Sequence, residues 1–359
     1  MGTILNIILF IIILGILIFV HELGHFLTAK KSGVFIHEFS LGMGPVIKQF
    51  KGKDGINYSI RALPIGGFVQ MAGEIYEDDE TNTVPKEKFM CNRPWYQRLI
   101  ILAAGVFNNF LLAIVLLFVI ALIWGAPSLK PQVYNVTEES AAEEAGMKAG
   151  DIITSVNGSK VNTWDKAQLL LLLKDKDGIY EITVKHEDGK TEELKIKPKA
   201  EKDEEGNERQ VFGIEIRSEV LKGDNALERI GISAKYAFQK FGSTLEQMWL
   251  TVVNLFTGKI SINNLSGPVG IYTVVGETRK AGIENVIFLI AYLSINLGIM
   301  NILPIPALDG GHILFLLIEL ITKKKINEKV EAITTTVFFA LLMILMIYIT
   351  IHDIITLIL

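Results

Sequence analysis

Two histidines near the end of the first apolar segment are spaced for metal binding. His21 and His25 flank Glu22 in an H-E-x-x-H pattern, and residues four apart lie on one face of an α-helix. Two neutral imidazoles on one face can share a metal ion, with the glutamate as general base. An interfacial histidine pair near Lys30 is the alternative, but three ionisable residues in an apolar helix are costly unless paired, ligated or hydrated. The pattern therefore predicts a catalytic metal site in a membrane helix.

Four apolar segments must position these residues. They run from Ile4 to about Ala29, from Leu99 to Trp124, from Val286 to Leu303 and from Ala332 to Leu359. Each is near the roughly 20 residues that cross a bilayer core. The first segment lacks the basic start and small-residue cleavage site of a signal peptide, so we expect it to be retained.

The composition agrees with a membrane location. Half of the 359 residues are hydrophobic and only 21% are charged, which is too little polar surface for a soluble protein. The net charge of -4 supplies no basic field for phosphates, so nucleic acid is not an expected partner. The single cysteine, Cys91, excludes an intramolecular disulfide.

Basic residues near the span ends predict the orientation. Lys30 and Lys31 follow the first span, and the lysines at 323–325 lie between the third and fourth. Because such loops remain in the cytoplasm, both termini and the segment 126–282 should be extracytoplasmic.

A catalytic zinc ion normally has three protein ligands and one open position, so a third ligand must come from another segment. The first and third spans run in the same direction, which places the end of the third span at the depth of the two histidines. Asp309 follows that end and is the leading candidate. His312 is the rival ligand, or else a hydrogen-bond partner of the ligands.

Cleavage inside a membrane requires an unwound substrate, because a helix in lipid satisfies its own backbone groups. The stretch from Tyr58 to Met71 alternates apolar and polar residues, as the edge of a hairpin or re-entrant loop would, and could pair with an extended substrate. Asparagines in the third span could bond the freed backbone or tie helices together. Prolines and glycines before His312 predict irregular backbone. The expected substrate-binding residues are Asn296, Asn301, Pro304, Pro306, Gly66, Gly67 and Asn108.

The segment after the second span has the composition of a small folded domain. Residues 140–158 resemble the helix-turn-strand signature of bacterial PDZ domains, with a turn at Asn157 and Gly158. The charged stretch 199–209 is expected to be a solvated loop. An amphipathic pattern over 226–257 predicts helices on the membrane surface or against the spans.

These motifs together resemble the site-2 protease family of intramembrane zinc metalloproteases. H-E-L-G-H in the first span, L-D-G-G-H after the third and a PDZ-like unit between them are most similar to the bacterial branch that includes the regulator of sigma-E protease, with a single PDZ domain. The resemblance implies that His21, His25 and Asp309 bind zinc and that Glu22 is catalytic. It also implies a bacterial cytoplasmic membrane location and transmembrane protein substrates.

The expected fold is a multi-pass α-helical membrane protein with four transmembrane helices, an inserted small α/β PDZ-like domain and a membrane-associated β-hairpin. The expected domains are 1–125, the first two spans with the zinc motif and a cytoplasmic hairpin loop; 126–220, the extracytoplasmic PDZ-like domain; 221–282, an amphipathic helical segment; and 283–359, the last two spans with the Leu-Asp-Gly motif.

Three function classes fit these features. The first is an intramembrane zinc endopeptidase that cleaves anti-sigma factors or remnant signal peptides, with substrates already trimmed to pass a size-selective outer domain. The second is a catalytically silent PDZ scaffold in the membrane, which Glu22 disfavours because zinc binding alone needs no glutamate there. The third is a divalent-cation transporter, which the lack of a visible internal repeat disfavours.

Overall fold

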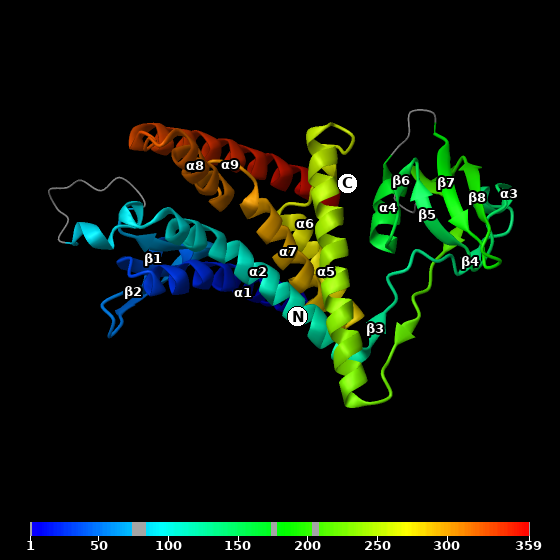
Figure 1. Ribbon diagram of the computed structural model, residues 1–359, viewed down its shortest axis with the longest axis horizontal. Helices are drawn as coiled ribbons and strands as arrows, with labels where there is room; N and C mark the ends of the chain where they lie inside the picture. Colours follow the sequence, from blue (N-terminus) through cyan, green and yellow to red (C-terminus); the bar gives the residue numbers. More distant parts are fainter. Residues whose placement is uncertain (1, 74–83, 174–177, 203–207, 359) are drawn as a thin grey trace. The chain divides into compact units, whose positions relative to one another are not determined.

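The computed structural model describes residues 2–73, 84–173, 178–202 and 208–358 (Figure 1). Its chain divides into two compact units. The first contains Met1–Leu116 and Asn263–Leu359, and the second contains Leu117–Ile262.

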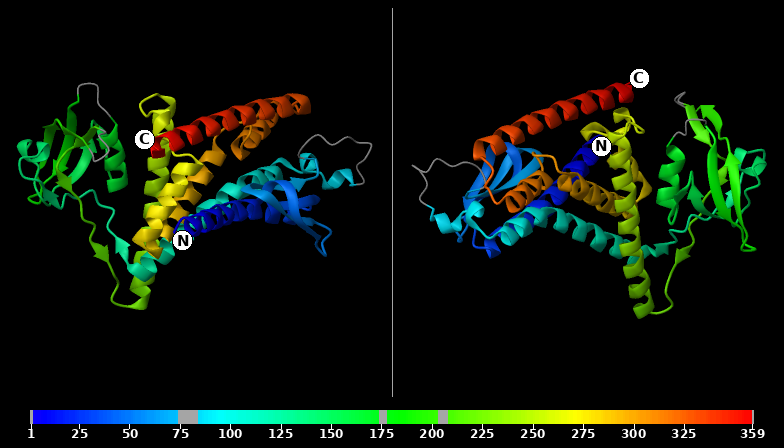
Figure 2. Two further views of the ribbon diagram at one scale, coloured as in Figure 1. Left: turned by 180° about the vertical axis from the view of Figure 1, so that it is seen from behind. Right: turned by 45° about the horizontal axis from the view of Figure 1, so that its top comes forward.

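Long apolar helices dominate the first unit. Among the described residues, four helices are long and apolar enough to cross a membrane, which confirms the four predicted spans. They are α1 (Gly2–Lys31), α2 (Trp95–Trp124), α7 (Ile283–Ile302) and α9 (Glu328–Ile358). Figure 2 shows α1 and the first part of α2 side by side from two further directions.

Two shorter helices complete this unit. Helix α6 (Pro268–Ala281) begins with proline, whose fixed φ suits a first helical turn. The carboxylate of Asp353 on α9 accepts hydrogen bonds from the backbone N–H of Gly267 and Gly270 at 2.9 and 2.8 Å. This distant cap satisfies two of the otherwise unbonded donors of α6. Residues 303–308 between α7 and helix α8 (Asp309–Thr322) are irregular as the sequence predicted, whereas 309–312, also predicted to be irregular, form the first turn of α8.

A curved hairpin follows α1. Strands β1 (Ile36–Lys51) and β2 (Asn57–Met71) pair twice, because each strand bends. The buried side chains of Phe39 and Val69 join a hydrophobic cluster with Phe26 of α1. The paired segments lie in the order 67–71, 36–41, 57–61 and 46–51, so 67–71 is an outer segment whose ladder, among the described residues, is with 36–41 alone.

The second unit contains a small sheet with the strand order β6-β5-β7-β8. The side chains of strand β7 (Tyr180–Lys185) alternate between core and solvent, as a half-buried strand requires. Asn157 and Gly158 have φ values of +47° and +72° in the turn from β5 to β6, which confirms the predicted turn. The elements are β5 (Ile152–Val156), β6 (Ser159–Lys160), β7 (Tyr180–Lys185), β8 (Thr191–Ile196), α3 (Ala141–Glu144) and α4 (Trp164–Leu172).

Short pairs of strands border this sheet. The prediction of a loop over 199–209 was wrong, because β9 (Lys199–Lys202) pairs with β10 (Glu208–Val211). Backbone pairing there needs no buried side chains, so composition did not reveal it; residues 203–207 lie outside the described part. The other pairs are β3 (Ala126–Pro127) with β12 (Val220–Leu221) and β4 (Asn135–Val136) with β11 (Ile214–Glu215).

Helix α5 (Ala226–Phe256) is the longest helix of the second unit. The side chain of Asn225 caps it by accepting the N–H of Glu228 at 2.9 Å. Asp165 at the start of α4 binds Lys240 and Ser243 of α5 at 2.8 and 2.7 Å. These bonds fix α5 against the small sheet domain by way of α4.

Candidate metal centre

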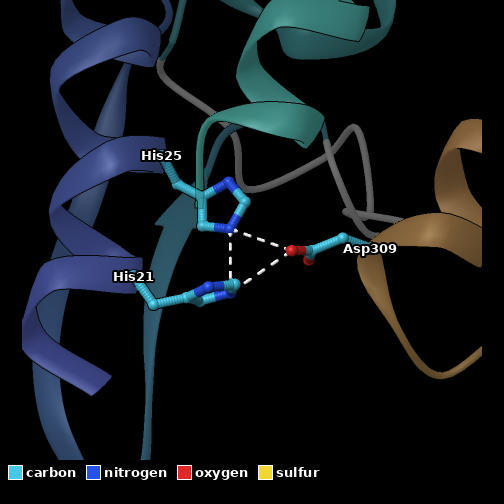
Figure 3. Close-up of side chains that lie close together, drawn as sticks. All are labelled: His21, His25 and Asp309. Atoms are coloured by element: carbon cyan, nitrogen blue, oxygen red, sulfur yellow. Dashed lines mark hydrogen bonds and ion pairs between the residues drawn. The ribbon is translucent and has the colours of Figure 1, made fainter. Parts of the chain in front are cut away.

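His21, His25 and Asp309 converge on one point inside the first unit (Figure 3). The Nε2 atoms of the two histidines are 3.3 Å apart. Asp309 Oδ2 lies 3.2 Å from Nε2 of His21 and 3.3 Å from Nε2 of His25. Both histidines are only 7% exposed. Two segments that are 284 residues apart in sequence, at 25 and 309, therefore build one cluster.

The donor set fits a catalytic zinc ion. Asp309 Oδ2 is buried and makes no hydrogen bond of acceptable geometry to any residue that the structure describes, so a lone pair is available in a place where an unsatisfied oxygen is costly. Two imidazole nitrogens and one carboxylate oxygen match the three ligands that catalytic zinc sites use. These three residues could hold zinc and leave one position for water or substrate.

Two glycines let α1 and α2 approach closely beside the cluster. A Cβ at Gly24 would lie 2.3 Å from the carbonyl oxygen of Ala104 on α2. A Cβ at Gly105 would lie 2.3 Å from Nε2 of His25 and 2.8 Å from Nε2 of His21. Gly105 therefore keeps open the space directly in front of the nitrogens that would bind the metal.

The other nitrogen of each imidazole has a partner on α2. Nδ1 of His25 lies 2.8 Å from the carbonyl oxygen of Ile101. Nδ1 of His21 lies 3.1 Å from Nδ2 of Asn109, a residue with 0% exposure. Partners of this kind fix the rotation of metal-binding histidines.

Asn109 was missed by sequence reasoning, which selected its neighbour Asn108. The structure places the amide of Asn108 at 3.1 Å from the carbonyl oxygen of Val20, where it ties α2 to α1. A signal for Asn109 existed: it follows Gly105 by four residues and so lies on the same face of α2. That signal becomes useful only once Gly105 is known to face the histidines.

The turn between α7 and α8 positions Asp309. Proline at 304 and 306 interrupts the helix, and α8 restarts at Asp309 itself. A Cβ at Gly310 would lie 2.2 Å from the carbonyl oxygen of Ile302, and one at Gly311 would lie 2.3 Å from that of Ile305. The Gly-Gly pair thus allows α8 to fold closely against the turn, with Asp309 in its first turn, where a carboxylate is favoured.

A cavity of about 620 Å³ opens onto the cluster. Glu22 lines it, and Gly67 of the hairpin brings backbone close to Glu22, since a Cβ at Gly67 would lie 3.1 Å from Glu22 Cγ. The outer hairpin segment therefore forms one wall beside the candidate base. The lining residues are His21, Glu22, His25, residues 67–71, Leu102, residues 307–309, His312 and Thr335.

A charged network holds this wall in shape. The guanidinium of Arg61 donates to Glu38 at 2.7 Å, to Ser40 at 3.0 Å and to the carbonyl oxygen of Gly44 at 2.9 Å. It also lies 5.0 Å from the ring centre of Phe68, which lines the cavity. Arg61 therefore links the inner segments of the hairpin to the outer one.

The remaining predicted residues lie at different distances from the cluster. Asn301 Nδ2 is 3.4 Å from His21 Nε2, so Asn301 is beside the metal site. Asn296 is exposed on α7 and does not line the cavity. The rival ligand His312 lines the cavity but has Nδ1 at 3.2 Å from Glu331 of α9.

The helix-breaking residues have structural surroundings of their own. Pro304 is exposed, whereas Pro306 is buried and its carbonyl oxygen accepts a hydrogen bond from Thr335 at 3.2 Å. Gly66 has a φ of +78°, a conformation that other residues rarely adopt, just before the wall begins.

Comparison with known proteins agrees with this geometry. The model of the family described as Peptidase family M50 matches residues 9–345. The regulator of sigma-W protease RasP of Bacillus subtilis is 34% identical over 425 aligned residues, covering 97% of this chain and 98% of that protein. The zinc metalloprotease RasP of Bacillus licheniformis is 31% identical over 435 residues, with 97% and 98% covered.

A protein of Clostridium acetobutylicum, whose name describes it provisionally as a zinc metalloprotease, is 36% identical over 350 residues, with 98% of this chain and 97% of that protein covered. The family match and the near full-length relatives point to the same class of enzyme. The chain therefore belongs to Peptidase family M50, the site-2 proteases, and is a zinc metalloprotease of a membrane.

Proposed function

We propose that this protein is an intramembrane endopeptidase in which His21, His25 and Asp309 hold zinc and Glu22 is the general base. The observation that carries the proposal is the shared cavity: the three candidate ligands, the glutamate and an outer strand of the hairpin all line it. A scaffold would not need the base, and a transporter would not need the strand.

The chemistry assigns a separate role to each group. Bound zinc would supply Lewis acidity for the scissile carbonyl and for the attacking water. Glu22 takes the proton of that water and delivers it to the departing amine. The amide of Asn301, with Nδ2 at 3.4 Å from His21 Nε2, would donate a hydrogen bond to a substrate oxygen that approaches this point.

The hairpin gives an unwound substrate a place to bind. Segment 67–71 is an outer strand that lines the cavity and pairs, within the described part of the chain, with 36–41 alone. A substrate strand added to its other edge would satisfy backbone groups that unwinding exposes in a membrane. Gly67 allows segment 67–71 to pass directly beside Glu22, and Gly66 precedes it with a φ of +78°.

The substrates are transmembrane segments of other membrane proteins. We propose anti-sigma factors and remnant signal peptides as two substrate classes. One relative, named a regulator of sigma-W protease, supports the first of them. We keep the sequence-based orientation, with both termini and residues 126–282 outside. The domain 126–220 is proposed to be PDZ-like, acting on substrate size or on peptide ends.

Replacing Glu22 by Gln tests the proposal. The amide keeps the shape of the side chain but cannot accept the proton, so cleavage of a model membrane helix should fall by about 10²- to 10⁴-fold while zinc stays bound. Glu277→Gln, at an exposed acid on α6 of the same unit, is the matched control and should cleave normally. Unreduced cleavage by the zinc-loaded Glu22→Gln protein would remove the general base from this account.

A further inference from the structure

We propose that Asn109 is the positioning residue for the metal ligand His21, with its amide oxygen accepting the Nδ1 proton so that Nε2 presents a lone pair to the metal. The inference deepens the proposed metal site and rests on it. It concerns a residue that makes no contact with the metal or the substrate.

Asn109 is held rigidly at this place. Its side chain is fully buried in α2, with Nδ2 at 3.1 Å from His21 Nδ1. The backbone carbonyl oxygen of Asn109 accepts a hydrogen bond from the Ser294 hydroxyl of α7 at 2.7 Å, and Ser294 is also fully buried. Its amide oxygen, Oδ1, is buried and has no hydrogen-bond partner within the described part of the chain.

The two orientations of this amide have opposite consequences for the imidazole. With Nδ2 toward His21, Nδ1 must accept, and a neutral ring then carries its proton on Nε2. Nε2 is the nitrogen that faces Asp309, so a metal could not use it. A half-turn of the amide brings Oδ1 to the same point, where it accepts a proton from Nδ1 and leaves Nε2 free.

That half-turn also gives the isolated oxygen the donor it lacks. It also moves Nδ2 to the former place of Oδ1, so one buried polar atom of the amide, at a cost of roughly 1–3 kcal/mol, lacks a described partner in either orientation. The position of Nε2 beside Asp309 therefore decides between the two orientations, because a metal ligand needs a free lone pair there.

His25 supplies an internal comparison. Its Nδ1 lies 2.8 Å from the carbonyl oxygen of Ile101, and a carbonyl can only accept, so Nδ1 carries the proton and Nε2 keeps its lone pair. Both ligands then have the same tautomer. A backbone carbonyl fixes the tautomer of His25, whereas the side chain of Asn109 fixes that of His21. Only the partner of His21 can therefore be removed by a substitution.

The test compares zinc affinities of purified full-length variants by competition with a chelator. Asn109→Leu has similar size but no acceptor, and should raise the zinc Kd about 10- to 100-fold. Asn109→Asp restores an acceptor and should return the affinity toward that of the unmodified protein. Ser294→Ala removes a buried hydrogen bond at the same residue without touching His21, and should leave the Kd unchanged.

The visible spectrum of the cobalt-substituted protein gives a second readout. A misoriented His21 should change the ligand-field bands of Asn109→Leu but not those of Ser294→Ala. Unchanged affinity and bands in Asn109→Leu would overturn the proposal, as would equal losses in Asn109→Leu, Asn109→Asp and Ser294→Ala, which would indicate packing alone.

Nitrogen-15 NMR of the zinc-loaded unmodified protein does not depend on folding of any variant. The signal of His21 Nδ1 should be that of a protonated nitrogen, and an unprotonated Nδ1 would refute the assignment. A different result would show that the proposed metal site itself is wrong. In that case His21→Ala would retain stoichiometric zinc, irrespective of any substitution at Asn109.

Discussion

The core of the small sheet domain and the interior around the metal site bury different kinds of side chain. The core of the small sheet domain is apolar, with Tyr180, Ile182 and Val184 of β7 fully buried. The interior between α1, α2 and α7 contains histidine, asparagine and serine, and two of its polar residues, Asn109 and Ser294, are also fully buried. One interior provides stability, whereas the other keeps costly polar groups for chemistry.

The comparison also shows how each interior is assembled. The sheet core comes from one stretch of the chain, and its strand pairs are local. The metal site needs α1, α2 and the start of α8, and two glycines let its helices come into contact. Substitutions in the sheet core should therefore change folding, and those at the candidate ligands or at residues in contact with them should change metal binding and activity.

Gly105→Ala should have the largest effect. The added methyl group would occupy the space in front of both Nε2 atoms, so zinc content should fall below one tenth of stoichiometric, roughly the loss expected when ligand geometry is disrupted. Gly15→Ala on α1 is the control, because a Cβ there meets nothing within 4 Å. Metal analysis of both proteins gives the result, and full zinc in Gly105→Ala would show that the helices can separate there.

Ile182→Ala should affect only the core of the small sheet domain. Removing a fully buried isoleucine costs about 2–5 kcal/mol, so the domain should unfold at a lower temperature while the chain keeps its zinc. Leu172→Ala, at a side chain that is 71% exposed, is the control and should change stability by less than about 0.5 kcal/mol. A loss of zinc from folded Ile182→Ala would mean that the two interiors are coupled.

The smallest effect concerns pH and the sheet domain. Hydrogen bonds to Asp151 at 2.6 Å and to Glu192 at 3.1 Å raise the pKa of His186. Its stabilising contribution is therefore complete below the unfolded pKa of about 6.5 and is lost as pH rises through the higher folded pKa. Scanning fluorimetry should show a lower Tm at pH 9 than at pH 6, and this difference in Tm should be smaller in His186→Gln. If the difference in Tm is the same in His186→Gln, other titrating groups cause it.

Much of the site could be predicted because its signals are local. The four-residue spacing of His21 and His25 requires only that the segment be helical, and span direction limits the depth of Asp309. The adjacent residues Asn108 and Asn109 show what local sequence signals do not predict. Both asparagines contact α1, and which of them reaches His21 depends on the rotation of α2, in which the close approach of Gly24 to Ala104 takes part.

The hairpin shows a second limit. Alternation over 58–71 predicted the edge of a hairpin or re-entrant loop, but the outer position of 67–71 follows from bends that make each strand pair twice. Such register depends on residues far along the chain, including the network of Arg61 and Glu38. The membrane association of this hairpin and the PDZ-like nature of the sheet domain stay predictions.

The central claim is the identity of the third metal ligand, and elemental analysis of two purified variants tests it most directly. Asp309 Oδ2 lies within 3.3 Å of both Nε2 atoms, whereas His312 is placed against Glu331. Asp309→Ala should therefore lose zinc, and His312→Ala should retain close to one zinc per chain. Stoichiometric zinc in Asp309→Ala together with its loss from His312→Ala would contradict the account and transfer the ligand role to His312.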